Sequence, residues 1–588
     1  MRRSAAARTR RPVVEGLEVR ALLNAAPTPD LAAMGVIDRP GGGTIVPLSV
    51  SASTFTAPES GGAVFKVRVD VEVGSAAAPS RFIVLDARGR AVGMGSSRAG
   101  VLAGRAVLGA GDYRVVVRGG GSGTGPIVVT ARMAGDVDGD HDVDATDLDA
   151  IRGNFGATRW GRPAFQSATP YDAGLDINGD GRVNPLDAAT TRRNLGAKLQ
   201  KVKLLVQLAP DARATLGAAN LYIAYTVTTA DGGFAYLNKY GVLTPLKGAD
   251  NSTPIHDVNY ANYSIPLSDP LVANGIDVDA NIGLNSTRIW ISAGAPIYFR
   301  VVTKDNDPNG QVTGIVQPSV TNPGDVNYNT VFDVQEFTLA GDVLYGNLTQ
   351  VDMFGLPMTL QFASGANATR KVGIDQPRDV VLSGLKSFLG ASALPADLVQ
   401  GITAQGNLRA LSVKSFLAPF ADKQAALAYF QSAIDQLWAK YPAGGPLSLR
   451  LKTLTATYDG QVTGDGMFTF TPVSGPSPAV KIAKPTSWNV FASNGPLALG
   501  NDERGALGAQ ISAALNRGVS HLDSSQWEIP ANFYPAAGPA NFYAQYWHTV
   551  SLGGLAYGFD YDDVGNQSTL LSIPNATQMT VTVHWNQA

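Results

Sequence analysis

The sequence of 588 residues contains no cysteine. This absence excludes disulfide bonds, zinc–thiolate sites and a thiol nucleophile. Export remains possible, because a large domain buries enough core to fold without disulfides. No apolar run approaches the roughly 18 residues that a membrane-spanning helix needs, so we predict no such segment.

Charged side chains are also scarce, at 16% of residues against about 25% in a typical soluble domain, and the net charge is only −2. A nearly neutral chain carries no general electrostatic footprint for nucleic acid or for an anionic membrane. Glycine and proline are abundant instead, with 65 and 35 residues, so turns are frequent and long helices few. We therefore expect a mainly β, multidomain protein without a nucleic-acid partner.

The first 24 residues are rich in arginine, and their one apolar run, Ala21 to Leu23, is too short for an ordinary secretory signal. The segment GLEVRALLN (16–24) resembles the N-terminal LEPR-x-LL sorting motif of some bacterial exported and surface proteins, with Val19 where that motif usually has proline. The alternative is a disordered basic tail over residues 1–27. The resemblance implies a secreted or cell-surface bacterial protein.

Residues 28–132 show the pattern of a small all-β module. In AVFKVRVDVEV, apolar residues from Phe65 to Val73 alternate with charged ones, which predicts a strand with one face in the core. Segments 81–89, 112–119 and 126–133 give further strand signals between glycine-rich turns. The module is similar to the pre-peptidase C-terminal type of β-sandwich, and we see no catalytic constellation in it.

An internal repeat occupies residues 134–198. DVDGDHDVDATD begins at Asp136 and DINGDGRVNPLD at Asp176, and each places oxygen-bearing side chains at loop positions 1, 3, 5 and 12. A short loop with this spacing wraps a calcium ion, and the ion offsets the repulsion between the aspartates. The first loop offers Asp136, Asp138, Asp140, the carbonyl of Asp142, and Asp147; the second offers Asp176, Asn178, Asp180, the carbonyl of Arg182, and Asp187. The alternative, an acidic solvated loop, does not explain a pattern that occurs twice in register.

Each loop is followed by one short helical pattern, and position 12 is aspartate instead of the glutamate of ordinary EF-hands. This duplicated loop–helix arrangement resembles a type I dockerin, which implies two structural calcium ions and docking to a cohesin module. His141 stands where the first loop would have its turn glycine, which weakens that site. The positions that usually contact cohesin, Ala145-Thr146 and Pro185-Leu186, differ between the repeats, so the sequence leaves the partner open.

Residues 200–588 are dominated by strand-like runs, interrupted by two helical patterns. One helix is predicted from Asp422 to Pro442, and another over 501–518 with Gly518 as its C-terminal cap. A β-rich body with a helical insertion near 370–440 suggests two lobes, and substrates often bind in a cleft between lobes.

Two carboxylates lie in apolar β context between Val331 and Leu360. Glu336 shares a strand face with Thr338, and Asp352 lies between Val351 and Met353. A lone buried carboxylate costs several kcal/mol unless it is paired or protonated, and apolar surroundings raise its pKa as a general acid requires. The residues alone leave two readings open, a catalytic role or a hydrogen-bonded structural acid.

EFT at 336–338, followed by NLTQVDMFGLP, resembles the core of glycoside hydrolase family 64, bacterial β-1,3-glucanases with a thaumatin-like β-barrel and a mixed α/β lobe. RIWIS (288–292), ANFYAQYWHTV (540–550) and YGFDYDDVGNQST (557–569) resemble further blocks of this family in the right order, over about 200–588. Asp560 stands where proline is more usual, a departure that we expect to matter little.

The resemblance implies that Glu336 is the general acid and Asp352 the general base of an inverting endo-β-1,3-glucanase without a catalytic cofactor. Inversion requires a carboxyl separation of roughly 6.5–9.5 Å, which leaves room for water. Candidate sugar contacts lie between the acids, on blocks of the resemblance, or on tryptophans able to stack on sugar rings: Thr338, Tyr345, Thr349, Trp290, Trp547 and Asp562, with Trp488 and Trp527 as further aromatics. For any single tryptophan, an ordinary core position is the commoner case.

These features predict hydrolysis of glucans such as laminarin or curdlan by a monomer. A second reading is a non-catalytic thaumatin-like glucan-binding surface protein, which the presence of Ala340, where the family often has asparagine, keeps open. A purely structural surface role would predict no glucan affinity. His548 and His584 are expected to be structural, because no Ser-His-Asp or metal-ligand histidine cluster accompanies them.

Overall fold

The computed structural model describes residues 31–586 except 38–42, 51–66, 76–78, 99–100, 110, 120–124, 139–141, 160–170, 173, 179, 200, 230–231, 281, 309, 341–342, 418–427, 475–476 and 499–501. The predicted sorting segment at 1–27 therefore lies outside the described residues. The chain forms two compact units: residues up to Lys201 with Asp279–Asn281, and Val202–Val278 with Ile282–Ala588.

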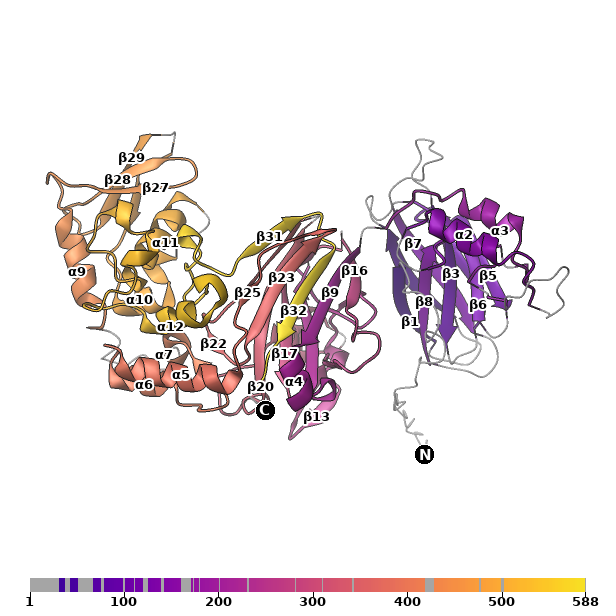
Figure 1. The fold of residues 1–588 in the computed structure, drawn as a ribbon, viewed down its shortest axis with the longest axis horizontal. Helices are drawn as coiled ribbons and strands as arrows, with labels where there is room; N and C mark the ends of the chain where they lie inside the picture. Colours follow the sequence, from indigo (N-terminus) through magenta and orange to yellow (C-terminus); the bar gives the residue numbers. More distant parts are fainter. Residues whose placement is uncertain are drawn as a thin grey trace, which may run out of the picture. The chain divides into compact units, whose positions relative to one another are not determined.

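The first unit contains one antiparallel sheet in the order β1-β8-β3-β6-β5-β4-β7-β2 (Figure 1). Its strands are β1 (Leu31–Ile37), β2 (Gly43–Val50), β3 (Val67–Ser75), β4 (Pro79–Leu85), β5 (Ala91–Arg98), β6 (Val101–Leu108), β7 (Gly111–Gly119) and β8 (Gly125–Met133). The all-β content agrees with the alternating patterns in the sequence. Hydrogen bonds join all eight strands into one sheet, and the β-sandwich arrangement stays a prediction.

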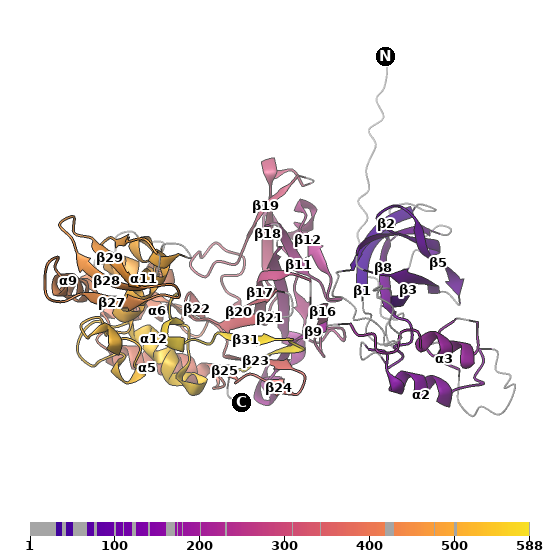
Figure 2. The same cartoon turned by 90° about the horizontal axis from the view of Figure 1, so that it is seen from above.

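The repeat folds as two loop–helix segments, with α2 (Ala145–Gly153) and α3 (Pro185–Thr191). Asp144 and Asn184 cap the helices, and each helix closes a capping box through the aspartate at its third position. Val143 and Ala197 are buried in the same apolar cluster as strands β4, β7 and β8. The repeat and the sheet therefore share part of one core, and both helices lie close to one end of the sheet in two views (Figures 1 and 2).

The second unit begins with a β lobe of open sheets. One sheet has the order β12-β11-β10-β17-β20-β21-β31 with β15 beside β10, a second β13-β14-β18-β19, and a third β16-β9-β32-β23-β24 with β25 beside β23. The strands are β9 (Lys201–Leu208), β10 (Leu221–Thr228), β11 (Phe234–Leu237), β12 (Leu243–Pro245), β13 (Thr253–Ile255), β14 (Val258–Asn262), β15 (Ile265–Pro266), β16 (Ile276–Asp279), β17 (Leu284–Ala293), β18 (Tyr298–Thr303), β19 (Val312–Val316), β20 (Val331–Ala340), β21 (Val343–Leu348), β23 (Met358–Ser364), β24 (Asn367–Ala368), β25 (Val372–Gly373), β31 (Leu571–Pro574) and β32 (Gln578–Val583), and α4 (Pro210–Thr215) follows β9. No sheet of the described residues closes into a barrel, so the barrel prediction is wrong and an arrangement of open sheets replaces it.

The helical lobe follows β22 (Met353–Phe354), which pairs with β26 (Ala410–Leu411). Its helices are α5 (Arg378–Ala391), α6 (Ala396–Ile402), α7 (Val413–Leu417), α9 (Gln431–Lys440), α10 (Ser487–Ala492), α11 (Glu503–Asn516) and α12 (Phe542–Val550), and its strands are β27 (Leu449–Lys452), β28 (Thr457–Val462), β29 (Phe468–Ser474) and β30 (Val480–Ile482). One buried cluster runs from Phe354 to Ala556 through all of these helices, so the helical lobe extends well beyond the predicted insertion near 370–440.

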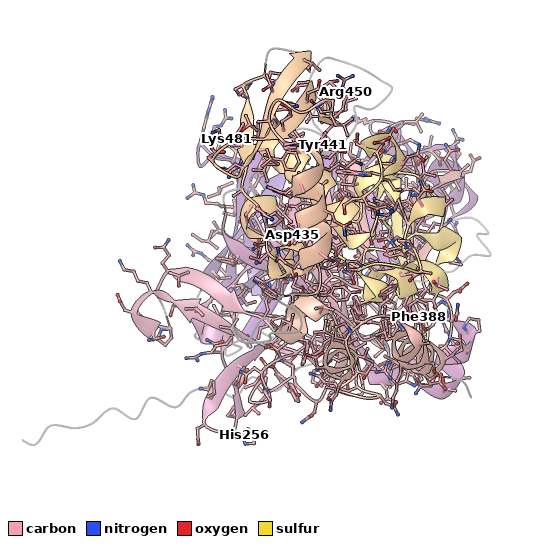
Figure 3. All side chains as sticks on the ribbon, turned by 90° about the vertical axis from the view of Figure 1, so that its left-hand side faces the viewer. His256, Phe388, Asp435, Tyr441, Arg450 and Lys481 are labelled. Carbon is pink, nitrogen blue, oxygen red and sulfur yellow. The ribbon has the colours of Figure 1, made fainter. Side chains whose placement is uncertain are left out.

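The helix predicted over 422–442 is present as α9, with Asp422 outside the described residues. Strands β27 to β30 form a small sheet. It packs on α9, where the ring centroids of Trp438 and Phe468 lie 4.7 Å apart. Figure 3 shows Asp435 on the outer face of α9, and Tyr441 directly follows this helix. The second predicted helix is α11, which ends before Gly518 at φ 71°, as its glycine cap indicated. Within the described part of the chain, no helix has the length and apolar character to cross a membrane.

Candidate active site and calcium loops

A row of polar side chains crosses the large sheet of the second unit. The strand register places Thr226 of β10 opposite Arg288 of β17, Arg288 opposite Glu336 of β20, and Glu336 opposite Asn347 of β21. Directly opposed residues in a sheet project on the same face, so these four side chains form one line. The side chains on the other face of β20, Gln335 among them, are buried, as the alternation in the sequence predicted.

This face forms one wall of a cavity of about 530 Å³. Its lining mixes polar and apolar side chains: Thr226, Val227, Thr228, Phe234, Ala235, Leu246, Ser286, Arg288, Ile315, Gln317, Glu336, Phe337, Thr338, Tyr345, Gly346, Asn347 and Leu570. Tyr345 is 44% exposed and presents an aromatic ring to solvent. The structure therefore brings together three predicted site residues, Glu336, Thr338 and Tyr345.

Glu336 is held by a cation instead of an apolar pocket. Arg288 Nε donates to Glu336 Oε1 at 2.8 Å, and Arg288 Nη1 donates to Gln317 Oε1. The Glu336 side chain is 37% exposed. The expected apolar surroundings of Glu336 are therefore wrong, because the alternation of a strand shows which face a residue occupies and not what covers that face.

Asp352 is also exposed, with 66% of its side chain open to solvent, although its neighbours Val351 and Met353 are buried. Lys414 Nζ lies 3.4 Å from Asp352 Oδ1 and 3.0 Å from Asp560 Oδ1. The two candidate catalytic carboxylates thus contact different cations. The departure at Asp560, expected to be of little consequence, supplies an ion pair beside Asp352.

The buried carboxylate of this region is Asp333, which the sequence analysis missed. It is 4% exposed, and it accepts hydrogen bonds from the backbone N–H groups of Val334, Gly355 and Leu356 at 2.7, 2.7 and 3.0 Å. Burial raises the pKa of Asp333 to about 6, against the opposing effect of these hydrogen bonds and of nearby Arg409. Asp333 stands on the buried face of β20, three residues before Glu336.

The predicted stacking of sugars on Trp290 and Trp547 is wrong. Trp290 is 4% exposed, donates to Thr226 Oγ1, and packs against Phe299 of β18 at 5.6 Å between ring centroids. Trp547 on α12 is fully buried against Phe354 at 4.8 Å. Trp527 is buried too, and Trp488 packs against the core of the helical lobe.

The predicted sugar contact of Asp562 is also wrong, because its side chain is fully buried. Its carboxylate accepts from Arg517 Nη2 at 3.1 Å and from the backbone N–H of Gly558 at 3.0 Å, and it lies 2.9 Å from His548 Nε2. This network fixes the turn that carries Asp562. His548, bonded also to the Gly554 carbonyl at 2.8 Å, is a structural histidine as predicted.

Thr338 and Thr349 are half-buried, and each accepts a backbone hydrogen bond. Thr338 Oγ1 accepts from Ser286 N at 3.2 Å, and Thr349 Oγ1 accepts from Val351 N at 3.1 Å. Both hydroxyls keep a proton to donate. Thr349 stands between Glu336 and Asp352 in sequence and does not line the cavity.

The loops of the first unit provide oxygen-rich donor sets that fit calcium. Carboxylate oxygens of Asp136, Asp138 and Asp147 come within 4.8 Å of one another, and Asp136 and Asp147 are buried. Burial raises the pKa of Asp147 to about 6. Three hard carboxylates gathered in one loop, two of them buried, match the preference of Ca²⁺ for oxygen ligands. Asp140 and His141 lie outside the described residues.

The second loop also has two buried aspartates and a closing set of backbone hydrogen bonds. Asp176 and Asp187 are buried, Asp187 accepts from the backbone of Asn178 and Asn184, and burial raises the pKa of Asp187. Asp180 Oδ1 accepts from the backbone N–H of Arg182, which turns the chain around the loop. In the first loop, the Asp142 side chain pairs with Lys198 at 2.9 Å, which is compatible with the predicted use of its carbonyl.

Sequence reasoning also missed the cationic partners of the site, Arg288 and Lys414, and the amides Gln317 and Asn347. Arg288 is the first residue of the RIWIS block, so its place on a strand was predicted, whereas its partner on β20 was not. Lys414 carried no local signal, because its contacts come from residues 62 and 146 positions away.

Comparison with known families gives two matches. The glycoside hydrolase family 64 profile, described as β-1,3-glucanase, matches residues 205–583, and the dockerin type I domain matches residues 134–196. Dockerin type I domains bind calcium.

Two curated relatives, both named glucan endo-1,3-beta-glucosidase, come from Arthrobacter sp. (strain YCWD3) and Cellulosimicrobium cellulans. Each is 28% identical over 291 residues, which is 49% of this chain and 50% of the relative. The chain therefore spans about half the length of the curated relatives it matches.

Two solved structures are similar to this chain. A family 64 β-1,3-glucanase domain from Clostridium beijerinckii is 27% identical with a TM-score of 0.56, covering 66% of this chain and 98% of that one. A laminaripentaose-producing β-1,3-glucanase in complex with laminaritetraose is 25% identical with a TM-score of 0.51, covering 65% and 98%.

Proposed function

The chain belongs to glycoside hydrolase family 64, and from this membership we propose that it is an endo-β-1,3-glucanase that acts by inversion. The observation that carries the proposal is the position of Glu336. This carboxylate lines a cavity of about 530 Å³ together with hydroxyl, amide and guanidinium side chains and the exposed ring of Tyr345. Such a lining combines hydrogen-bonding groups for sugar hydroxyls with an aromatic face for a pyranose ring.

Glu336 is the proposed general acid, which donates its proton to the glycosidic oxygen as the bond to the leaving sugar breaks. The proton transfer leaves a carboxylate, and Arg288, 2.8 Å away, stabilises that negative charge. Asp352 is the proposed general base, which removes a proton from the attacking water on the opposite face of the sugar. The two carboxylates contact different cations, Glu336 with Arg288 and Asp352 with Lys414.

Sugar contacts are proposed for three of the predicted residues. Tyr345 offers its exposed ring, and Thr338 and Thr349 offer hydroxyl donors. Asn347 is added to these, because its side chain lines the cavity directly opposite Glu336. Trp290, Trp547 and Asp562 have no place in this proposal, since their side chains are buried.

The first unit is proposed to bind two calcium ions through the loops at Asp136 and Asp176. When bound, the ions supply charge neutralisation that fixes the loops, and no catalytic step uses them. The match to dockerin type I domains supports a cohesin module as partner and a secreted or cell-surface location. The resemblance of 28–132 to pre-peptidase C-terminal modules and the monomeric state stay predictions.

The test is the release of reducing oligosaccharides from laminarin by the wild type, Glu336→Gln and Asp352→Asn. We expect release by the wild type and a loss of several orders of magnitude in both variants, with unchanged circular dichroism. Proton NMR of the fresh products must show the inverted anomer first. A wild type that binds laminarin without cleaving it overturns the hydrolase proposal in favour of the glucan-binding protein. A wild type that neither binds nor cleaves it leaves a structural role.

A further inference from the structure

Lys414 lies between two carboxylates, one of which is the proposed general base Asp352. Its Nζ is 3.4 Å from Asp352 Oδ1, and 3.0 and 3.3 Å from the two carboxylate oxygens of Asp560. The Lys414 and Asp560 side chains are 30% and 32% exposed, so both are more shielded from water than Asp352 at 66%. A single cation therefore forms ion pairs with the proposed general base and with the less exposed Asp560.

The backbone brings Lys414 to Asp352. Strands β22 and β26 pair Met353 with Leu411, and Ser412 N donates to the Asp352 carbonyl at 3.0 Å, which extends the pairing by one residue. Helix α7 starts immediately afterwards and carries Lys414 in its first turn. β22 lies between the sheets and the helices of the second unit in both ribbon views (Figures 1 and 2).

Asp560 is held independently, from the C-terminal side of the chain. Tyr557 Oη donates to the Asp560 carbonyl at 2.9 Å, and Gln350 N donates to the Tyr557 carbonyl at 2.9 Å. Two residues after Asp560, the buried Asp562 forms an ion pair with the buried Arg517, which also anchors this loop. Asp560 is thus part of an ordered loop anchored to the segment that leads to Asp352.

The charges around Asp352 come from few elements. Lys414 on α7 and Asp560 in the loop face it, and Tyr543 on α12 is close enough that Asp352 contributes to raising the pKa of its phenol, after the larger effect of burial. Burial also raises the pKa of Tyr557. Burial lowers the pKa of Lys414, but Asp560 and Asp352 outweigh it, so the net shift is upward and the ammonium is retained. Burial raises the pKa of Asp560, partly offset by Lys414.

We propose that Lys414, shared between Asp352 and Asp560, is a positioning residue that orients Asp352, and that Lys414 and Asp560 together set the low-pH limit of glucan hydrolysis. The inference rests on the proposed role of Asp352 as general base. The contact with Lys414 at 3.4 Å directs the Asp352 carboxylate, which must accept a proton from water. Without it, Asp352 faces only the like charge of Asp560, which disfavours ionisation of either acid.

The experiment compares the pH profile of kcat/KM on laminarin for the full-length wild type, Lys414→Met, Lys414→Arg, Asp560→Asn and the double variant Lys414→Met/Asp560→Asn. We expect the acid limb to move to higher pH by about half to one unit in Lys414→Met, since the cation is lost. In Asp560→Asn the acid limb moves to lower pH, because the neighbouring negative charge is lost and Lys414 pairs with Asp352 alone. Lys414→Arg and the double variant stay close to the wild type.

Opposite displacements in the two single variants support the proposal, because a loss of packing lowers kcat at every pH without moving the limb. An acid limb that stays in place in both folded single variants overturns it. Circular dichroism and thermal melting check folding, and Lys481→Met, in an exposed pair with Asp465, is the matched control for removing a lysine. Failure of the proposed function is distinct, since the wild type itself then releases no oligosaccharides.

Discussion

Asp333 accepts a hydrogen bond from the backbone N–H of Gly355 at 2.7 Å. Asp333 stands three residues before Glu336 on β20, and Gly355 stands three residues after Asp352, so one buried carboxylate links the two segments that carry the proposed acid and base. The approach is close: a Cβ on Gly355 would lie 1.9 Å from the Phe332 carbonyl. Arg378 Nε completes the junction by donating to the Gly355 carbonyl.

Asp333→Asn is expected to lower kcat at least tenfold with little change in KM, because the amide cannot accept all three backbone hydrogen bonds and the two segments shift. It also leaves Arg378 and Arg409 buried without their nearby carboxylate, which costs about 3 kcal/mol of unfolding free energy. Kinetics on laminarin and urea denaturation measure both effects. Asp459→Asn, which breaks an exposed pair with Arg450, is the control and should cost below about 1 kcal/mol. Equal effects of the two variants would contradict the special role of Asp333.

Arg288→Gln is expected to lower kcat/KM about 100-fold, since the positive charge next to Glu336 stabilises the carboxylate left after proton transfer. Arg288→Lys keeps the charge but loses the second donor to Gln317, so its loss should be smaller. Steady-state kinetics on laminarin measure the order. Arg300→Gln, on the exposed side of β18, is the control. If kcat/KM of Arg288→Lys is no higher than that of Arg288→Gln, the positive charge is not the cause of the rate loss.

The stability of the second unit should fall as pH rises above about 6.5. Burial lowers the pKa of His548, but Asp562 outweighs it, so the net pKa is raised. A histidine with a raised folded pKa contributes its full stability below the unfolded value of about 6.5, and this is lost as pH rises through the folded pKa. Denaturation between pH 6 and 9, followed by tryptophan fluorescence, reports this unit, which holds six of the seven tryptophans.

The control for this pH dependence is a histidine without partners of this kind. His548→Gln should flatten the slope, whereas His256→Gln, at an exposed turn (Figure 3), should leave it unchanged. A slope that survives in His548→Gln would assign the pH dependence to other groups.

Removal of calcium by EGTA should lower the melting temperature of the first unit and leave that of the second unchanged. The loops share apolar core with the β-sheet through Val143 and Ala197, so loss of the ions is expected to destabilise the sheet as well. Calorimetry resolves the two units, and isothermal titration counts the ions. Asp187→Asn should remove one ion and Asp147→Asn the other. Identical melting with and without EGTA would contradict the calcium proposal.

The sequence by itself determined the local structure of this protein. Alternation of apolar and polar residues predicted β20 and the shared face of Glu336 and Thr338, and twofold repetition predicted the loops at Asp136 and Asp176. Capping patterns predicted α11 and its end at Gly518. These features depend on residues within about one turn or one strand, so periodicity and spacing are sufficient to reveal them.

Only the tertiary structure decided what covers each face. Arg288 and Trp290 project on the same side of β17, yet Arg288 lines the cavity while Phe299 of another sheet covers Trp290. Likewise Asp333 is buried and Asp352 is exposed, although both stand among apolar neighbours in sequence. The physical reason is that burial and ion pairing depend on segments far along the chain, as the contacts of Asp352 with Lys414 and of Lys414 with Asp560 demonstrate.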